Sequence, residues 1–298
     1  MYVVLVNPKA GNNQGVKQWR KLEQVFISKN IAYRAFVTSS EQETREIVWE
    51  CKEKKSLTAF LVVGGDGTVH TVIQDLAGSN IPIALLPAGS GNDLARALKL
   101  TNNPNKLAEA LLKLEIRELD VLHVNGNYCL TIAAVGMDAA VTDHAARSFY
   151  KRWLNVLRVG ALTYVLSALL VIPRYKPFHV EIRIDDDQYI TEKVWMVACG
   201  NTQSYGGGMM VCPFAHPIDG IIDLVFLHTV NRRTIIGKLL PKVYSGKHIN
   251  KEGVTYLKGR NIHISSDRPL KVIADGEIIG ETPVAIRVKE KAIKFIVT

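Results

Sequence analysis

The stretch AFLVVGGDGTVHTV, residues 59–72, decides the fold of the first half of the chain. Its apolar run, Ala59 to Val63, is typical of a buried strand, and a helical pattern follows the glycines. The apolar residues of that helix recur at i, i+3, i+4 and i+7, as Val69, Val72, Ile73 and Leu76. Three glycines at a strand-to-helix junction favour close approach of the backbone to a phosphate group. Asp66 nevertheless places a negative charge in the centre of this loop.

The same alternation of strand and helix extends over the whole first half of the chain. Strands are predicted over Tyr2 to Asn7, Ala32 to Val37, Ala59 to Val63 and Ile81 to Leu86, and helices over Val16 to Lys29, Glu41 to Lys54 and Thr68 to Ala77. This alternation is the signature of a parallel sheet with helices on both faces. We therefore predict a Rossmann-like, doubly wound α/β domain over residues 1–122.

The second half of the chain changes to short alternating strands. They are predicted over Tyr128 to Val135, His179 to Ile184, Lys193 to Gly200, Asp223 to Leu227, Ile262 to Ser265, Leu270 to Ala274 and Ala285 to Val288. A basic, apolar helical region, Ser148 to Pro173, interrupts them. The pattern predicts a mainly-β domain over residues 123–298, either a β-sandwich or an open barrel.

The composition restricts the classes of partner. The chain has 298 residues, 47% of them hydrophobic, which suits two domains with separate cores. A net charge of +9 favours acidic partners such as nucleotide, anionic lipid or nucleic acid. Because the basic residues are interspersed with acidic ones and no RNA-binding signature or zinc spacing occurs, we expect no nucleic acid. A non-catalytic basic protein that binds anions remains the alternative from another class.

Cysteine usage and hydropathy indicate a cytoplasmic protein. The four cysteines, Cys51, Cys129, Cys199 and Cys212, form no CxxC pair and are expected to be reduced core thiols. The opening residues MYVVLVNPKAG lack the pattern of a signal peptide. The most apolar segment, Val159 to Pro173, is shorter than the roughly 20 residues that a spanning helix needs.

Two further loops repeat the design of GGDGT. Pro87 to Asp93, PAGSGND, follows the fourth predicted strand, and Asn7 to Gly11, NPKAG, follows the first. In an open parallel sheet, ligands bind at the carboxyl ends of the strands where the strand order reverses. We therefore expect these loops to line one crevice.

Two better-known phosphate loops are excluded. GSGNDLA begins like the dinucleotide fingerprint GxGxxG, but Leu94 stands at the third glycine, and the loop does not follow the first strand. A Walker loop, GxxxxGK[ST], is absent. A nucleoside triphosphate would therefore need something other than a P-loop lysine to balance its charge.

A divalent cation would explain the carboxylates in these loops. Mg²⁺ is commonly held by one or two carboxylates together with substrate phosphates and water. Asp66, Asp93 and Asp120 would hold the metal or its waters, while glycine N–H groups and helix N-termini take the phosphate oxygens. The structural alternative is that each aspartate caps a helix or a turn.

The segments VVGGDGTVHTVIQDL, LPAGSGNDLARAL, the opening NPKAG and a late ADGE resemble the diacylglycerol kinase catalytic-domain family. This family includes bacterial diacylglycerol kinases and the sphingosine and ceramide kinases. The resemblance extends over nearly the whole chain. It implies an N-terminal domain like those of NAD kinases and phosphofructokinases, a C-terminal β-sandwich, and ATP and Mg²⁺ as co-substrate and cofactor.

The resemblance also implies an ATP site. Its expected contacts are Asn7, Pro8, Lys9, Ala10, Gly11, Thr38, Gly64, Gly65, Asp66, Gly67, Thr68, Val69, His70 and Ser90. Ala10 stands where the family often has serine or threonine, so one hydroxyl contact to phosphate is expected to be missing. Without the resemblance, Thr38 and Ser90 are equally well explained as turn residues, and His70 as a solvated or capping residue.

For catalysis, the resemblance implies Glu277 as the base that accepts the proton of the lipid hydroxyl, with Asp66, Asp93 and Asp120 supporting the site. From pattern alone, Asp275-Gly276 is a good hairpin turn, and Glu277 simply follows it.

The segment Asp219 to Asp223, DGIID, resembles the family's DGxxD metal-binding segment. It implies a structural Mg²⁺ bound by Asp219 and by the carbonyl groups of His216 and Ile221. The alternative is an ordinary turn before a strand.

The segment KRWLNVLRVGALTYVLSALLVIPRYKP places aromatic and basic residues around a short apolar centre. This pattern suits contact with a membrane interface and equally suits a buried helix. These features together predict a cytoplasmic kinase, peripherally associated with the inner face of the membrane, that phosphorylates a neutral lipid alcohol, diacylglycerol first. Phosphatidylglycerol, a sphingoid base or an isoprenoid alcohol is the alternative acceptor, and an NAD kinase-like activity is the alternative reaction. The resemblance is compatible with a homodimer.

Overall fold

The structure is a computed structural model that describes residues 1–148 and 161–298. Contacts divide the chain into two compact units. Unit 1 comprises Met1–Leu119 and Lys291–Thr298, and unit 2 comprises Asp120–Glu290. The predicted domain ranges, 1–122 and 123–298, stay a prediction, and the contacts add that the last eight residues pack with unit 1.

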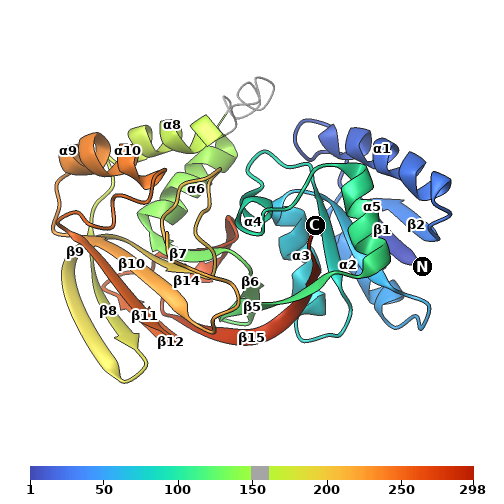
Figure 1. The fold of residues 1–298 in the computed structure, drawn as a ribbon. Helices are drawn as coiled ribbons and strands as arrows, with labels where there is room; N and C mark the ends of the chain where they lie inside the picture. Colours follow the sequence, from blue (N-terminus) through green and yellow to red (C-terminus); the bar gives the residue numbers. More distant parts are fainter. Residues whose placement is uncertain (149–160) are drawn as a thin grey trace. The chain divides into compact units, whose positions relative to one another are not determined.

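Unit 1 contains a sheet of parallel strands (Figure 1). Its elements are β1 (Tyr2–Val6), α1 (Gln14–Ser28), β2 (Tyr33–Val37), α2 (Glu41–Lys52), β3 (Ala59–Gly64), α3 (Asp66–Leu76), β4 (Ile83–Pro87), α4 (Asp93–Ala97) and α5 (Pro104–Lys113). The strand order is β4-β3-β1-β2, and Phe295 of β15 (Val284–Ile296) pairs in parallel with Ile83 of β4. Because the order reverses between β1 and β3, the switch point of the sheet lies between these two strands.

Helices cover both faces of this sheet. Alternate residues of β1, beginning with Tyr2 and Val4, belong to a core cluster with residues of α1 and α5. Successive strand residues point to opposite faces, so Val3 and Leu5 face the other side. The other pair of helices, α2 and α3, pack against each other with buried apolar residues such as Ile73. The predicted doubly wound α/β fold is therefore confirmed.

Unit 2 is mainly β. Its elements are β5 (Ile116–Val124), β6 (Asn127–Cys129), β7 (Ile132–Gly136), α6 (Met137–Arg147), α8 (Ala161–Val171), β8 (Phe178–Ile184), β9 (Asp187–Gly200), β10 (Ile222–His228), α9 (Arg232–Thr234), the π-helix η1 (Ile235–Leu239), α10 (Leu240–Val243), β11 (Val254–Gly259), β12 (Asn261–Ser266), β13 (Lys271–Ala274) and β14 (Glu277–Glu281). β5 begins in unit 1, and β15 runs from unit 2 into unit 1.

The strands of unit 2 form a sandwich that the long strand β9 joins. Its first half pairs with β8, and residues 196–200 lie between β7 and β10. One layer is β8-β12-β15 and the other is β14-β13-β7-β9-β10-β11. A core cluster between them draws alternate residues from both layers, including Val180, Ile264 and Val197. The predicted β-sandwich is confirmed.

A helical layer, made of α6, α8 and the run α9-η1-α10, lies on one side of the unit 2 strands (Figure 1). A second core cluster joins it to the sheet, with Ala134 of β7, Ala168 of α8 and Leu239 of η1 among its members. In the described residues, no helix is both long and apolar enough to cross a membrane.

One segment that is predicted as a single strand forms two strands in the structure. Tyr128 to Val135 is divided into β6 and β7 because the backbone N–H groups of Leu130 and Thr131 donate to the carboxylate of Asp275 instead of joining a strand ladder. Two other strands, β9 and β15, are longer than predicted.

Candidate active site

The three glycine-containing loops meet at the switch point of the unit 1 sheet. Gly64, at the end of β3, pairs with Pro87 of β4, and the N–H of Ala88 donates to the carbonyl of Gly64 at 2.7 Å. A β-carbon added to Gly89 would lie 2.6 Å from the Cα of Gly65, and one added to Gly11 would overlap the carbonyl of Ala88. The backbones of the loops after β1, β3 and β4 are therefore in direct contact, as predicted.

Asp66 joins two of these loops. Its Oδ2 accepts the backbone N–H of Asp93 at 3.0 Å, and its Oδ1 accepts the N–H of Leu94 at 3.1 Å. These are orphan donors at the start of α4, so Asp66 caps a helix that lies 27 residues further along the chain. Asp66 therefore caps a helix, as the structural alternative in the sequence analysis predicts. Each carboxylate oxygen has a second lone pair, so capping does not use up the capacity of this group to bind a cation.

Asp93 is buried at the first position of α4. Its Oδ1 accepts from the guanidinium of Arg96 at 2.5 Å, and Arg96 also donates to the carbonyl of Gly91 at 3.0 Å. Asn92 adopts a left-handed conformation, φ 51°, and its side chain closes the turn by accepting the N–H of Gly89 at 2.9 Å. The side chains of the GSGND loop thus hold its shape.

The loop after β1 is tied to GGDGT by side chains. Asn7 donates from Nδ2 to the hydroxyl of Thr68 at 2.9 Å and accepts the N–H of Lys9 at 3.0 Å. The ammonium group of Lys9 reaches the carbonyl of Ser39 at 3.3 Å, beyond the end of β2. Thr38 is buried beside β1, where its N–H donates to the carbonyl of Val6 at 2.9 Å.

The other expected ATP contacts lie in the same loops. Ser90 is exposed, whereas Ala10, Val69 and His70 are buried. The burial of His70 contradicts its reading as a solvated residue, because the helix α3 packs it inside unit 1. Pro8 and Gly67 complete the loops at partly exposed positions.

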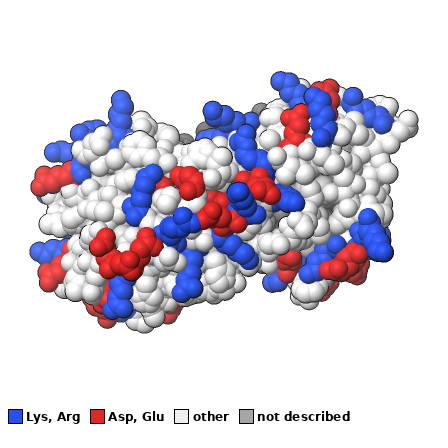
Figure 2. All heavy atoms as spheres, turned by 60° about the horizontal axis from the view of Figure 1, so that its bottom comes forward, with Lys and Arg blue, Asp and Glu red and all other residues white. Residues whose placement is uncertain are grey.

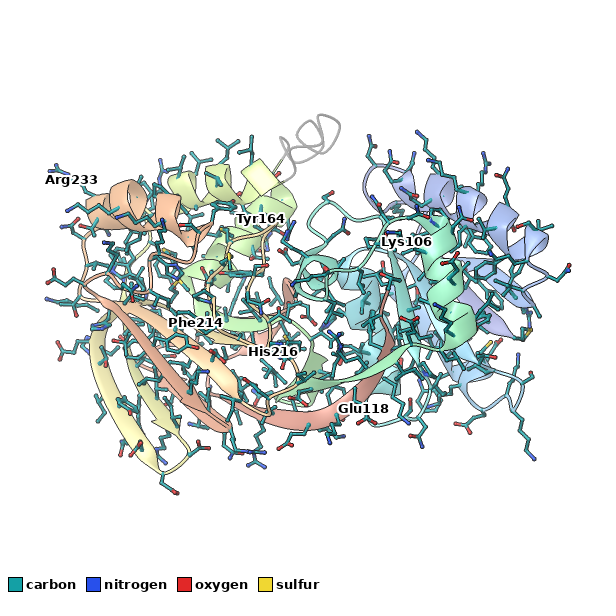
Figure 3. The ribbon with its side chains drawn as sticks, in the orientation of Figure 1. Lys106, Glu118, Tyr164, Phe214, His216 and Arg233 are labelled. Carbon is teal, nitrogen blue, oxygen red and sulfur yellow. The ribbon has the colours of Figure 1, made fainter. Side chains whose placement is uncertain are left out.

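Asp120 lies in unit 2 and is connected to the DGIID segment. Its Oδ2 accepts the N–H of Gly220 at 2.8 Å, and its own N–H donates to the carbonyl of Pro217 at 2.7 Å. Asp219 accepts the N–H of Ile221 at 3.1 Å, and the carbonyl of His216 accepts the N–H of Ile218 at 2.9 Å (His216 is labelled in Figure 3). The segment is a hydrogen-bonded turn, as the structural alternative predicts.

The environment of Asp223, the last residue of DGIID, favours a cation at this segment. Its carboxylate is fully buried, and neither oxygen has a hydrogen-bond partner within the described residues. The ammonium group of Lys258 lies 3.7 Å away, beyond hydrogen-bond range. Desolvation raises the pKa of Asp223 to about 6, and the negative charge of Asp219 adds to this rise. A buried carboxylate beside a second one fits a bound cation.

Glu277 begins β14 directly after the turn Asp275-Gly276. Both turn residues have positive φ, 51° and 87°, as a type I′ hairpin requires. The carboxylate of Asp275 accepts the N–H groups of Leu130 and Thr131 and the hydroxyl of Thr131 at 2.7 to 3.1 Å. The predicted hairpin is confirmed. Asp275 anchors it to the sheet, and Glu277 is exposed at its tip.

The residues in the loops fit Mg²⁺ as the family uses it. Asp66 and Asp93 are adjacent acidic residues of neighbouring loops. Across residues 1–148 and 161–298, no group of three or more His, Cys, Asp or Glu side chains is arranged to hold a metal ion. Two acidic residues in adjoining loops would suit an ion held by one or two carboxylates together with phosphate and water.

A cavity of about 90 Å³ lies between the helical layer and the sheet of unit 2. Its lining is largely apolar and includes Val141, Ala168 and Leu239. Two of its lining residues, Asp138 and His248, each carry a buried polar atom, Oδ2 and Nδ1, that has no hydrogen-bond partner within the described part of the chain. Burial raises the pKa of Asp138 to about 6, and a hydrogen bond from Tyr205 opposes this rise.

Sequence reasoning did not identify this cavity. Its lining comes from α6, α8, β9, β10, β11, the run η1-α10 and residues between these elements, such as Tyr205 and His248, which are distant in the sequence. The one local signal is Asp138, an acidic residue in the apolar stretch TIAAVGMDAAV. The predicted core cysteines are confirmed: all four are free and buried.

The surface charge agrees with the interspersed pattern of the sequence. On the face that Figure 2 presents, Lys and Arg side chains alternate with Asp and Glu side chains, and no long stripe of one sign is visible. This face therefore does not resemble a nucleic-acid track.

Fold and site together define a two-unit protein, with glycine loops at the switch point of a doubly wound α/β unit and a β-sandwich in the second unit. Two family models match: the diacylglycerol kinase catalytic domain over residues 1–124, and the YegS C-terminal NAD kinase beta sandwich-like domain over residues 131–297. The chain belongs to the diacylglycerol kinase catalytic-domain family, as the resemblance predicted.

Known relatives extend over almost the whole chain. A Mycobacterium tuberculosis protein named "Diacylglycerol kinase" is 28% identical over 298 residues, covering 98% of this chain and 93% of the relative. "Putative lipid kinase YtlR" of Bacillus subtilis is 28% identical over 292 residues, covering 94% of each. The crystal structure of a "putative diacylglycerol kinase" from Bacillus anthracis strain Sterne has a TM-score of 0.80 at 23% identity, covering 100% of this chain and 97% of that one, which supports the fold.

Proposed function

We propose that this chain is a lipid kinase that transfers the γ-phosphoryl group of ATP to the hydroxyl group of a neutral lipid. Diacylglycerol is the expected acceptor, and phosphatidic acid the product. The observation that carries the proposal is the contact of three glycine-containing loops at the switch point of a parallel sheet. Membership of a family whose relatives are named diacylglycerol kinase and lipid kinase supports it.

In this proposal, unit 1 binds the nucleotide. The phosphates lie against the loops at 7–11, 64–68 and 89–91, and the N-terminus of α3 adds favourable partial charge. Asp66 and Asp93 hold Mg²⁺, which when bound supplies the positive charge that lets a triphosphate lie beside these carboxylates. Ala10 removes one side-chain hydroxyl donor from this loop.

Unit 2 supplies the proton acceptor. The oxygen of the lipid hydroxyl attacks the γ-phosphorus, the bond from that phosphorus to the β,γ-bridging oxygen breaks, and ADP leaves. Glu277, an exposed carboxylate at the start of β14, takes the hydroxyl proton as a general base. Asp275 acts as a positioning residue because it anchors this hairpin. Asp120 supports the site through the segment that contains Asp219.

The apolar cavity of unit 2 favours a lipid acceptor. Lining residues such as Val141 and Ala168 offer surface for a hydrocarbon chain, which a kinase for a wholly polar acceptor does not require. A cytoplasmic enzyme that works at the inner face of the membrane follows from the same proposal, since the acceptor resides in the bilayer.

A kinase assay tests the proposal. Full-length protein is incubated with Mg²⁺ and radiolabelled ATP, and with diacylglycerol, phosphatidylglycerol, a sphingoid base, an isoprenoid alcohol or NAD, the lipids in mixed micelles. We expect Mg²⁺-dependent labelling of diacylglycerol that is lost in Asp66→Ala and in Glu277→Gln. Labelling of NAD without any lipid would overturn the lipid assignment. Salt-sensitive DNA binding without turnover would instead support a non-catalytic anion-binding protein.

A further inference from the structure

We propose that the outer side of the helical layer of unit 2 docks on an anionic lipid bilayer. The inference rests on the proposed lipid kinase function, and it names the surface through which the enzyme reaches its substrate. Three observations carry it: an exposed apolar face on α8, a nearby run of cations without acidic residues, and the cavity beneath both.

The helix α8 has two different sides. Thr163, Ser167 and Ala168 are buried against the rest of unit 2. The opposite side presents four leucines that are 38% to 47% exposed: Leu162, Leu166, Leu169 and Leu170. Their spacing of i, i+4, i+7 and i+8 places them on one stripe of the helix. A contiguous exposed apolar stripe marks an interaction surface more often than a chance exposure.

The cations lie on the neighbouring part of the layer. Residues 228–251 contain six Lys or Arg and no Asp or Glu, and residues 161–176 also contain no acidic residue. The six are Arg232, Arg233, Lys238, Lys242, Lys247 and Lys251. Arg233 projects away from the body of unit 2 at α9 (Figure 3). The ammonium group of Lys251, with those of Lys238 and Lys247, lowers the pKa of Lys242, so these four charges are close together.

The leucine stripe and the cations are on adjacent elements. The guanidinium of Arg232 donates to the carbonyl of Tyr175, four residues beyond α8, at 2.9 Å. The inner sides of α8 and of η1-α10 line the same cavity through Ala168 and Leu239. Figure 1 shows α8, α9 and α10 on the same side of the sheet. The outer sides of these elements therefore form one surface with an apolar and a basic part.

An anionic bilayer fits this surface better than other occupants do. Its headgroups attract the cations, and its acyl region accepts leucine side chains. A second copy of the chain would bring one cluster of cations against another, which is repulsive. A nucleic acid would leave the leucines without an apolar partner. The cavity between these helices and the sheet offers apolar surface to a hydrocarbon chain drawn from the same bilayer.

Vesicle sedimentation tests the inference with the full chain. We expect binding to vesicles of phosphatidylcholine with phosphatidylglycerol, and weak binding to phosphatidylcholine alone. Each cation near an anionic surface contributes about fivefold to the affinity, so Lys242→Gln, Lys247→Gln and Lys251→Gln together should weaken binding roughly 100-fold. Leu166→Glu with Leu170→Glu should abolish the binding that persists at high salt.

The matched control carries the same charge change on unit 1: Lys21→Gln, Lys29→Gln and Lys55→Gln, three exposed lysines. It should bind vesicles like the natural sequence. Circular dichroism and ATP binding verify that each variant is folded. Equal vesicle binding by all variants would overturn the inference, as would a leucine variant that changes only a dimer–monomer equilibrium. The kinase assay decides the proposed function separately, because vesicle binding does not depend on turnover.

Discussion

Asp93 donates its backbone N–H to Oδ2 of Asp66 at 3.0 Å, so acidic residues of two neighbouring glycine loops are joined by one hydrogen bond. This relationship gives Asp66 two separable roles. It caps α4 as a hydrogen-bond acceptor, and in the proposed function it holds Mg²⁺ as an anion.

Substitution of Asp66 separates these roles. Asp66→Asn keeps an acceptor oxygen but removes the charge, whereas Asp66→Ala removes both hydrogen bonds and should lose about 1–3 kcal/mol of unfolding free energy. We expect both variants to lose Mg²⁺-dependent ATP binding. Asp66→Asn should be destabilised less than Asp66→Ala, because its amide oxygen keeps one of the two N–H contacts while its NH2 group cannot accept the other. Calorimetric titration and chemical denaturation measure the two effects. Full activity in Asp66→Asn would mean that the carboxylate serves only as a cap.

Glu277→Gln tests the proton acceptor. Loss of a general base commonly lowers the rate by about 10²- to 10⁴-fold. Because Gln has nearly the same size and shape as Glu, and Glu277 is exposed at the start of β14, the substitution should leave the fold and ATP binding intact. Glu281→Gln, at the exposed other end of β14, is the matched control. Similar turnover by the two variants in the lipid assay would exclude Glu277 as the base.

Gly89→Ala tests the contact between the loops. The new β-carbon would lie 2.6 Å from the Cα of Gly65, so the loops must separate. We expect a loss of roughly 1–3 kcal/mol in unfolding free energy and weaker ATP binding. Gly237→Ala introduces the same methyl group where no atom lies within 4 Å and should not destabilise the protein. Unchanged nucleotide affinity in Gly89→Ala would separate this contact from the ATP site.

Asp138 should make stability depend on pH. Burial raises its folded-state pKa to about 6, above the value of 3.8 in the unfolded chain, so the native state binds the extra proton between these values. Stability relative to Asp138→Asn is therefore greatest at low pH and is lost as pH rises to about 6. Between low pH and pH 7, the unfolding free energy of the natural sequence should fall by roughly 3 kcal/mol relative to that of Asp138→Asn. Urea denaturation at several pH values measures it, with exposed Asp186→Asn as the control.

Asp223 should couple stability to Mg²⁺. Its buried carboxylate has no hydrogen-bond partner within the described residues, so Asp223→Asn should raise the Tm in the absence of metal. Added Mg²⁺ should raise the Tm of the natural sequence more than that of Asp223→Asn. Asp66→Asn, which alters the nucleotide loops, should keep this response in the absence of ATP. If Asp223→Asn responds to Mg²⁺ as the natural sequence does, the DGIID segment does not bind the ion.

The sequence predicts most of unit 1 because its signals are local. The apolar run Ala59 to Val63 and the helical spacing after Thr68 each lie within one element, and tertiary packing agrees with both. The three loops could also be placed together, since parallel strands end at one edge of their sheet.

Contacts between distant segments were not predictable in the same way. Asp66 caps α4 by accepting the N–H of Asp93, which lies 27 positions away in the sequence. Asp275 anchors its hairpin at Thr131, which lies 144 positions away. No local pattern signals either of them, which is why Tyr128 to Val135 was predicted as one strand. No local pattern signals the cavity either, since segments far apart in the sequence create it.

The return of β15 to unit 1 has a consequence for biosynthesis. Phe295 and Ile296 are fully buried there, and Phe295 pairs with Ile83 at the β4 edge of the sheet. A ribosome that has translated the first 119 codons has therefore not yet produced the strand that completes the N-terminal unit. Until residues 291–298 have been synthesised, the β4 edge of unit 1 lacks its partner from β15 and stays open to pairing with other strands.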